Sequence, residues 1–332
     1  MRRRSSKGWA SLLQRSLKAF TAPAVRAGRQ ATQRALAAGV RKLRPPAGAG
    51  LWWPGLAVGA RGTRRYMLFR PSALPAGQRV PLLVMLHGCG QDASSFAQST
   101  RMNALAARQG CVVLYPEQDR LANLQGCWNW FDTDSGRAQV EAELILKAMD
   151  MACALCPVDP TRVAVVGFSA GASMAALLAT RHPERFGAVV MHSGVPPGSA
   201  HSSASALAAM RGRHAPAPTA GPHIWPPLLV IHGDADGVVS PRNAMAAARL
   251  WADAGGARAL PPRTQQRGKR YPMDVTDHRR GRRLVVQTVA VRRLGHAWSG
   301  GAAGQPFSDA QGPDATRLTW AFVSKAWAQG LP

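Results

Sequence analysis

The sequence is poor in acidic residues. Its 332 residues include 17 Asp and Glu against 42 Lys and Arg, which gives a formal net charge of +25. Residues 1–45 hold 12 Lys and Arg and no acid, and residues 258–293 hold 11 that are opposed only by Asp274 and Asp277. Such a distribution attracts polyanions, acidic surfaces or anionic lipid. An arginine-rich background with a solvated face explains the charge equally well, and we expect no specific nucleic-acid partner.

Long apolar runs are also missing. No segment approaches the ~18 consecutive apolar residues that cross a bilayer, so we expect no transmembrane segment. Residues 1–4, Met-Arg-Arg-Arg, resemble the start of a signal peptide, but no apolar stretch of sufficient length follows them. The sequence therefore predicts no cleavable secretion signal.

Cysteine is scarce and odd in number: Cys89, Cys111, Cys127, Cys153 and Cys156. Cys153 and Cys156 form a C-x-x-C pair, but no second pair accompanies it, so a metal or redox site is not expected there. Cys111 begins an apolar segment and is expected to be a core thiol. We predict neither a metal ion nor an organic cofactor.

The N-terminal residues differ in composition from the rest. Residues 9–20 place apolar side chains at helical spacing among bases, which fits a basic amphipathic helix lying on a membrane, a lipid-coated particle or a partner. A partly disordered basic arm is the alternative. Pro45, Pro46 and the Gly/Ala run to Gly50 indicate a linker. We therefore predict a basic arm and linker over residues 1–50 and a catalytic domain over residues 51–332.

After Pro71, strand-like and helix-like segments alternate. We expect strands at 80–87, 111–115, 163–166, 188–192, 228–232 and 285–291, and helices at 102–108, 138–154, 171–180, 243–253 and 316–329. This alternation predicts an α/β fold with a mainly parallel central sheet and helices on both faces. Residues 196–227 and 260–283 break the rhythm, and we expect both to be loops or insertions over the carboxyl edge of the sheet, where ligands bind.

Residues 162–171, Arg-Val-Ala-Val-Val-Gly-Phe-Ser-Ala-Gly, carry the most informative motif. A β-branched run ends in G-x-S-x-G, and a helix of small residues follows. This context is that of a nucleophile elbow, a tight strained turn that presents a serine hydroxyl. It predicts Ser169 as a nucleophile and the backbone N–H of Ala170 as an oxyanion donor.

A serine nucleophile needs a base, and the base needs an orienting acid. The strand at 228–232 is followed by Asp234 and Asp236, and the strand at 285–291 is followed by His296. We predict Asp236 as the acid and His296 as the base. Asp236 is preferred because it falls deeper in its turn, and Asp234 is the alternative acid. The alternative bases are His192, His232 and His278.

A second oxyanion donor is expected from the loop after the strand at 80–87. Residues 87–91, His-Gly-Cys-Gly-Gln, resemble the H-G-G-G type of oxyanion loop. The backbone N–H of Cys89 is the candidate donor. The alternative is a turn that takes no part in the chemistry.

Six short blocks occur in one order between residues 64 and 328. They are 87–91, 126–131 (Gly-Cys-Trp-Asn-Trp-Phe), 167–171, 232–236 (His-Gly-Asp-Ala-Asp), 295–301 (Gly-His-Ala-Trp-Ser-Gly-Gly) and 312–316 (Gly-Pro-Asp-Ala-Thr). Together they resemble the poly(3-hydroxybutyrate) depolymerase family of esterases, which have the α/β-hydrolase fold. The resemblance implies the same nucleophile, acid, base and oxyanion loop that the motifs predict.

The resemblance also implies substrate contacts and a disulfide. It places Trp128, Trp130 and Trp298 near the substrate cleft, and it suggests a Cys89–Cys127 disulfide. The implied substrate is poly(3-hydroxybutyrate) or its oligomers. A feruloyl or acetylxylan esterase is the alternative within the family, and a granule- or polyanion-binding protein with little catalysis is the alternative outside it.

The predicted location follows from the basic arm and from the missing secretion signal. Both fit a cytoplasmic or storage-granule-associated protein in which the arm attaches to a granule or another anionic surface. The extracellular location of many family members is the alternative. A Cys89–Cys127 disulfide is unusual in a reducing cytosol.

Overall fold

A computed structural model describes residues 46–214, 216 and 225–330 of the chain. Residues 1–45, the greater part of the predicted basic arm, lie outside the described residues. The first strand begins at Gly50. In the described part of the chain, no helix combines the length and the apolar character needed to cross a bilayer.

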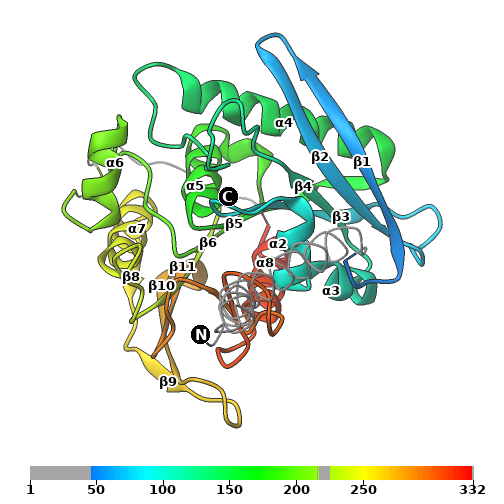
Figure 1. Ribbon diagram of the computed structural model, residues 1–332. Coiled ribbons are helices and arrows are strands. Elements are labelled where there is room, and N and C mark those ends of the chain that lie inside the picture. The colour runs from blue at the N-terminus through cyan, green and yellow to red at the C-terminus, as the bar shows by residue number, and fades with distance from the viewer. Residues whose placement is uncertain (1–45, 215, 217–224, 331–332) are drawn as a thin grey trace, which may run out of the picture. The chain divides into compact units, whose positions relative to one another are not determined.

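One mixed β-sheet organises the described residues (Figure 1). Its strands are β1 (Gly50–Gly59), β2 (Gly62–Pro71), β3 (Val80–Leu86), β4 (Val112–Pro116), β5 (Val158–Phe168), β6 (Ala188–His192), β7 (Leu228–Gly233), β8 (Arg258–Ala259), β9 (Arg263–Gln265), β10 (Met273–Arg280) and β11 (Arg283–Val291). Their order is β1-β2-β4-β3-β5-β6-β7-β11-β10-β8, with β9 paired to β10. The six strands from β4 to β11 in this order run parallel. A separate pair, β12 (Trp298–Ser299) and β13 (Ser308–Asp309), lies in the segment after β11.

Helices cover both faces of the sheet. They are α2 (Ala93–Thr100), α3 (Met102–Gln109), α4 (Arg137–Leu155), α5 (Ala170–Arg181), the short 3-10 turn η1 (Pro183–Arg185), α6 (Ser203–Met210), α7 (Arg242–Ala254) and α8 (Ala315–Ala328). One apolar core gathers residues of α4, α5 and α7, and the other gathers residues of α2, α3 and α8. The predicted α/β fold with a mainly parallel sheet and helices on both faces is therefore confirmed.

The central strands are buried on both sides. In β3 every residue is buried, with Leu82 and Val84 in the first core and Leu83 and Met85 in the second. Because successive side chains of a strand point to opposite faces, a continuous apolar run is what a doubly covered parallel strand requires. This pattern made the central strands recognisable from sequence.

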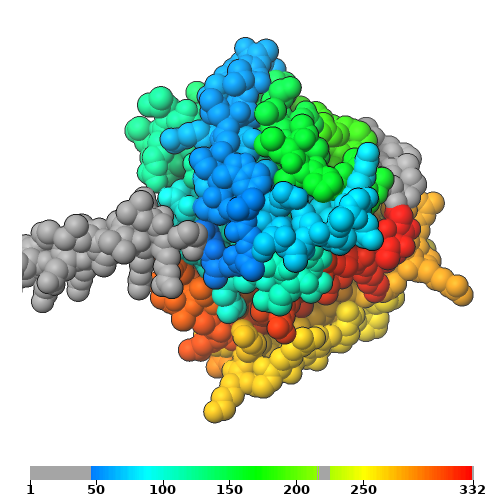
Figure 2. All heavy atoms as spheres, turned by 90° about the vertical axis from the view of Figure 1, so that its right-hand side faces the viewer, coloured from blue at the N-terminus to red at the C-terminus, as the bar shows by residue number. Residues whose placement is uncertain are grey.

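Two edges of the sheet were not predicted. Residues 50–71 form the β1–β2 hairpin, whose outer strand β1 is largely exposed on the face shown in Figure 2. The expectation that residues 260–283 are a loop over the carboxyl edge is wrong, because β9 and β10 lie there and β10 pairs antiparallel with β11. A two-residue turn that includes Gly281, with a φ of 57°, joins β10 to β11.

Candidate active site

Ser169 sits in the turn between β5 and α5. Its φ is 55° and its ψ is −123°, a backbone conformation that costs a non-glycine residue on the order of 1–3 kcal/mol. The turn is tight because a Cβ at Gly167 would overlap the backbone of Gly171, and a Cβ at Gly171 would overlap the carbonyl of Leu86. The Ser169 N–H donates to the His192 carbonyl at 2.8 Å, which ties the turn to β6. These contacts form the strained elbow that the motif predicted.

Three predicted side chains lie in one hydrogen-bonded series. His296 Nε2 is 2.9 Å from Ser169 Oγ, and His296 Nδ1 is 2.8 Å from Asp236 Oδ2. The Asp236 side chain is fully buried, and that of His296 is 10% exposed. The ring of Phe168 packs against the imidazole at 5.0 Å between centroids. This is the geometry of an acid, base and nucleophile set for proton transfer.

The carboxylate of Asp236 is held on both oxygens. Its Oδ1 accepts from the backbone N–H groups of Val238 and Val239 at 2.9 Å each. His232 Nε2 lies 3.4 Å from its Oδ2 and 2.9 Å from the Val239 carbonyl. Burial acts to raise the pKa of Asp236, but hydrogen bonds from His232 and His296 outweigh it and hold the pKa well below its usual range. The acid is therefore ionised and fixed in direction.

Backbone contacts bring the acid turn to the histidine loop. The N–H of Asp234 donates to the Val291 carbonyl at 3.0 Å, and its side chain accepts from the Arg293 N–H at 2.6 Å. The N–H of Ala235 donates to the Leu294 carbonyl at 3.2 Å. Asp234 thus joins the two loops and does not meet His296, so the structure brings together the preferred acid and base.

The alternative histidines occupy other positions. His192 is fully buried, and its Nε2 accepts from the Ser299 N–H at 3.1 Å. Burial, followed by the charges of His232 and His296, lowers the pKa of His192 to about 3. His278 lies in β10 near the edge of the sheet. Of the alternative histidines, His232 contacts the series through its imidazole, as a partner of the acid, whereas His192 contacts Ser169 through its backbone carbonyl.

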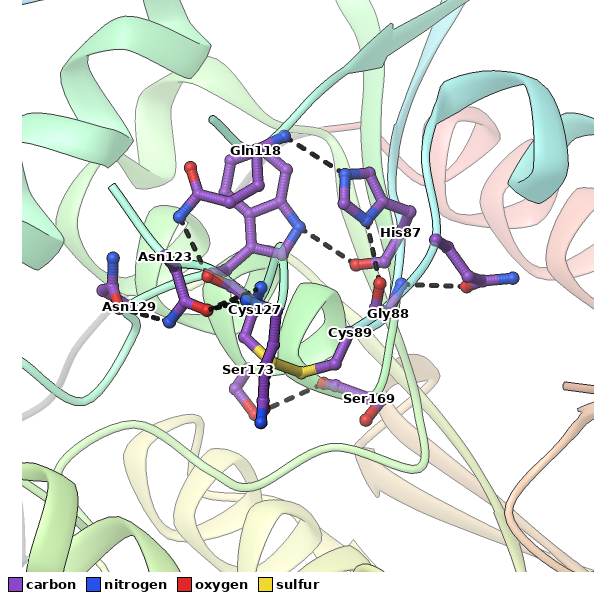
Figure 3. Close-up of a disulfide and its surroundings, with 12 residues drawn as sticks. His87, Gly88, Cys89, Gln118, Asn123, Cys127, Asn129, Ser169 and Ser173 are labelled. Carbon is purple, nitrogen blue, oxygen red and sulfur yellow. Dashed lines mark hydrogen bonds between the residues drawn. A yellow bond between two sulfur atoms is a disulfide. The ribbon is translucent and has the colours of Figure 1, made fainter. Parts of the chain in front are cut away.

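The oxyanion loop lies beside Ser169 and is cross-linked. Cys89 and Cys127 form a disulfide, which Figure 3 shows between the loop of His87 and the loop of Asn129. The N–H groups of Gly88 and Gly90 donate to Gln91 Oε1 at 3.0 Å and to the Gln125 carbonyl at 2.8 Å. The N–H of Cys89 remains the candidate donor in this loop. As the first residue of α5, Ala170 carries an N–H that the helix itself does not use.

His87 fixes the start of this loop. Its Nδ1 is 2.9 Å from the Gly88 carbonyl, and its Nε2 accepts from the Gln118 N–H at 3.1 Å. Burial is the main reason that its pKa falls to about 4, so the ring is neutral at pH 7. Its carbonyl accepts from Trp128 Nε1 at 2.9 Å. Figure 3 shows His87 and these contacts near the disulfide.

A buried polar network holds the loop of residues 117–131 from behind. Gln118 donates to Glu141 at 2.7 Å and to the Cys127 carbonyl at 2.9 Å, and it accepts from Arg64 at 2.6 Å. Glu141 also accepts from the backbone and side chain of Asn129 at 2.9 and 2.6 Å. Arg64 and Glu141 are each 2% exposed. Burial lowers the pKa of Arg64, and the charge of Glu141 opposes that effect.

A cavity of about 270 Å³ opens at Ser169. Apolar side chains form much of its wall, namely Trp128, Trp130, Phe131, Leu207, Met210 and Val239. Among the described residues that line it, none is charged. Helix α6, which the sequence analysis assigned to a loop region, contributes part of this wall. Such a cavity suits a neutral, largely apolar molecule.

The three predicted tryptophans divide into two groups. Trp128 and Trp130 line the cavity, although both are buried. The expectation for Trp298 is wrong, because it is fully buried outside the cavity lining and stacks on His192 at 5.0 Å. Its Nε1 donates to Thr316 at 3.1 Å. Trp298 therefore packs behind the elbow.

Gln118 and Glu141, which support the cavity wall through hydrogen bonds, were not predicted from the sequence. Gln118 has no sequence signal that distinguishes it from a loop residue. Glu141 has one, since it is an acid on the apolar stripe of α4, between Ala138 and Ile145. Within the described residues, no group of three or more His, Cys, Asp or Glu side chains is placed to hold a metal ion.

Comparisons with known proteins agree with this site. The profile of the family described as esterase PHB depolymerase matches residues 64–259. The poly(3-hydroxyalkanoate) depolymerase C of Paucimonas lemoignei is 31% identical over 242 residues, 68% of this chain and 56% of that protein. The feruloyl esterase B of Neurospora crassa is 31% identical over 196 residues, 52% of this chain and 64% of that protein. The chain thus spans somewhat more than half the length of these relatives.

A solved structure shows the same fold. The acetyl xylan esterase from Aspergillus awamori superposes with a TM-score of 0.53 at 18% identity, covering 74% of this chain and 94% of that one. At this identity the likeness extends to the fold alone. The family match covers more than half of the sequence and includes the elbow and the acid turn. The chain belongs to the esterase PHB depolymerase family.

Proposed function

We propose that the protein is a serine hydrolase that cleaves carboxylic esters through an acyl-enzyme. The observation that carries this proposal is the continuous series Asp236–His296–Ser169, with both heavy-atom separations below 3 Å. His296 Nε2 accepts the Ser169 proton as Oγ attacks the ester carbonyl, and Asp236 stabilises the imidazolium that results. The proton then passes to the leaving alcohol, and water releases the acid by the reverse sequence.

The oxyanion of each tetrahedral intermediate is assigned to two backbone donors. These are the N–H groups of Ala170, at the start of α5, and of Cys89, in the cross-linked loop. Loss of one such donor costs on the order of 3 kcal/mol of transition-state stabilisation. No step of this mechanism calls on a metal ion or an organic cofactor.

The proposed substrate class is a neutral ester with an apolar body, most of all poly(3-hydroxybutyrate) or its oligomers. The uncharged cavity wall supports it, because an apolar wall accepts short aliphatic ester units without an uncompensated charge. The depolymerase C of Paucimonas lemoignei supports it as well. A feruloyl or acetylxylan ester is the second candidate, favoured by the aromatic side chains of Trp130 and Phe131 at the cavity and by the relative from Neurospora crassa.

Two measurements test this function. A fluorophosphonate probe should label Ser169 in the wild type and should fail to label the Ser169→Ala and His296→Gln variants, with the labelled peptide identified by mass spectrometry. Initial rates on 3-hydroxybutyrate oligomers, amorphous polymer and methyl ferulate then rank the substrates. Labelling of a different serine would contradict the proposed nucleophile, and methyl ferulate as the best substrate would favour the second candidate.

Attachment of the basic arm to a storage granule or anionic surface is also proposed, from its charge alone. Electrostatic attachment should weaken steeply as salt rises, whereas hydrolysis of a soluble neutral ester should stay constant. If attachment and ester hydrolysis were lost together as salt rises, the arm and the esterase site would not act separately. Location in the cytoplasm or on granules, or outside the cell, is a proposal that depends on this attachment.

A further inference from the structure

A second cavity, of about 480 Å³, lies away from Ser169. Three segments distant in sequence meet there: the α2–α3 junction with Arg101, the β9–β10 connection with Arg267 and Arg270, and the start of α8 with Asp314 and Arg317. None of its lining residues is shared with the cavity at Ser169. In Figure 1 the β9–β10 connection projects from the edge of the sheet. The esterase mechanism leaves these side chains without a role.

The lining of this cavity is strongly basic. Four arginines face one acid, Asp314, among the described residues that line it. A further cavity of about 340 Å³ shares Arg101, Asp314 and Arg317 with it and adds Arg108. Like charges that line one cavity repel one another where they lie within the screening length of physiological salt, about 8 Å. An anion between them would remove that repulsion.

Asp314 neutralises the cluster only in part, because one carboxylate faces four arginines. Its Oδ1 caps α8 by accepting from the Arg317 N–H at 3.0 Å. Its Oδ2 forms ion pairs with Arg101 at 3.9 Å and Arg317 at 3.8 Å, both longer than a hydrogen bond. The carboxylate therefore serves the helix end first, and the arginines keep donors for another partner.

Two of the guanidinium groups are positioned by the backbone. Arg101 donates to the Gly300 carbonyl, and Arg270 donates to the Gly312 and Ala310 carbonyls. Arg101 also has a φ of 56°, the left-handed region that glycine or asparagine fills at lower cost. An arginine has five N–H donors in a fixed fork, so one or two carbonyl contacts leave the others for an oxyanion.

Part of the lining is apolar. It is formed by Met273, Pro313, Leu318 and Ala321, of which Met273 is buried. A ligand that fills this space presents an anionic group to the arginines and an apolar body to this wall. Inorganic phosphate alone would leave the apolar side without contact.

We propose that this cavity binds a phosphate monoester with an apolar body. The lining carries a surplus of three positive charges, from four arginines against Asp314, which suits a dianion better than a carboxylate. A phosphate monoester carries about −1.5 to −2 at pH 7 and offers three acceptor oxygens to the guanidinium forks. The proposal is independent of the esterase activity.

Calorimetric titration of the full chain with phenyl phosphate tests the proposal. We expect saturable binding and a rise in Tm of about 3 °C or more at saturation. The double variant Arg267→Ser/Arg317→Ser should bind at least about tenfold more weakly, since it loses two charged contacts. Arg249→Ser, a change of an exposed arginine on α7, is the matched control and should bind as the wild type does.

Further probes separate the sources of the phosphate. Inorganic phosphate, phenol and benzoate should each bind more weakly than phenyl phosphate. Vesicles that contain phosphatidic acid test for a lipid source, and their capture by the wild type but not by the double variant would support the site with a lipid as its ligand. Equal binding of phenyl phosphate by the wild type and the double variant, or tighter binding of benzoate, would overturn the proposal. The proposal would also be overturned if the wild type bound neither phenyl phosphate at millimolar concentration nor the phosphatidic acid vesicles.

Discussion

The two cavities of this molecule differ in how they are charged and in how they are built. The cavity at Ser169 has no charged lining residue among those described. The buried Arg64 and Glu141 do not line it, and Gln118 bridges them through hydrogen bonds. The second cavity places arginines directly on its surface, with Asp314 as the only acid among the described lining residues. The first arrangement favours neutral molecules and the second favours anions. The comparison teaches that a basic protein can keep its reaction site free of its own net charge.

The largest expected effect is a loss of ester hydrolysis that leaves ligand binding in the second cavity unchanged. Ser169→Ala should lower the hydrolysis of p-nitrophenyl butyrate at least about a thousandfold, because it removes the nucleophile. Phenyl phosphate should still bind to this variant with unchanged affinity. Esterase rates and calorimetry on the same preparation measure both. Retention of wild-type hydrolysis would remove the assigned role of the elbow.

The next largest effect is expected from removing the Cys89–Cys127 disulfide, which should lower stability and activity. A Cys89→Ala/Cys127→Ala variant removes a cross-link between residues 38 apart, which should cost about 3 to 4 kcal/mol of unfolding free energy by loop entropy. Urea denaturation measures the loss. The esterase rate should fall with it, because the loop that carries the Cys89 N–H is no longer tethered, whereas the phosphate site should be unaffected under native conditions.

Thiol titration of the unreduced protein provides an independent check. Three free thiols are expected, those of Cys111, Cys153 and Cys156. Five thiols in protein isolated with its native redox state preserved would indicate a reducing location. Three would favour the extracellular alternative, since disulfides persist in oxidising compartments.

The buried network allows a closely matched pair of variants on α4. Glu141→Gln replaces a carboxylate that accepts three hydrogen bonds and removes a negative charge that favours the buried Arg64 guanidinium, which should cost about 3 kcal/mol. Glu143→Gln, two residues away, breaks only the exposed pair with Arg61 and should cost less than about 0.5 kcal/mol. Urea denaturation of both variants gives the two values. Similar costs for the two would show that the network does not support the wall.

The pH dependence of stability should be the smallest of these effects. His87 has a pKa of about 4 in the folded protein, below the value near 6.5 of an unfolded chain, because burial favours its neutral form. The unfolded state therefore binds the proton first, and the stabilisation present above pH 6.5 is lost as the pH falls toward 4. The free energy of unfolding of the wild type should therefore fall between pH 6.5 and 5, and in the His87→Gln variant this fall should be smaller by about 1 to 2 kcal/mol. An unchanged slope in urea titrations would contradict the assignment of a neutral His87.

The elbow was predictable because its information is local. A β-branched run, Gly167, Ser169 and Gly171 occur within ten residues, and the constraint that glycine relieves involves the same segment and one neighbouring strand. Asp236 and His296 were predictable from their order along the chain, each after an apolar strand, and these strands are the parallel neighbours β7 and β11. The choice of Asp236 over Asp234 depends on backbone bonds from Val238 and Val239, which the order alone does not contain.

The remaining features depend on contacts between distant segments. Trp298 was misplaced because an aromatic residue beside His296 can point to either side of its loop, and the stacking on His192 decides which. Residues 273–280 were misread because they lie in a basic segment that contains Pro and Gly, and because Asp277 interrupts the apolar alternation of β10. It is buried there by Arg263, Arg279 and Gln287. The arginine cavity joins three segments that no sequence window contains.

The Cys89–Cys127 cross-link has a consequence for selectivity. It connects, through covalent bonds, the backbone that we propose polarises the ester carbonyl with the residue that precedes Trp128 in the cavity wall. A substrate that presses on this wall therefore strains the oxyanion donor as well, and a poorly shaped ester loses alignment at the reacting carbon. Because that loss occurs in the transition state, discrimination among esters should appear in kcat more than in KM.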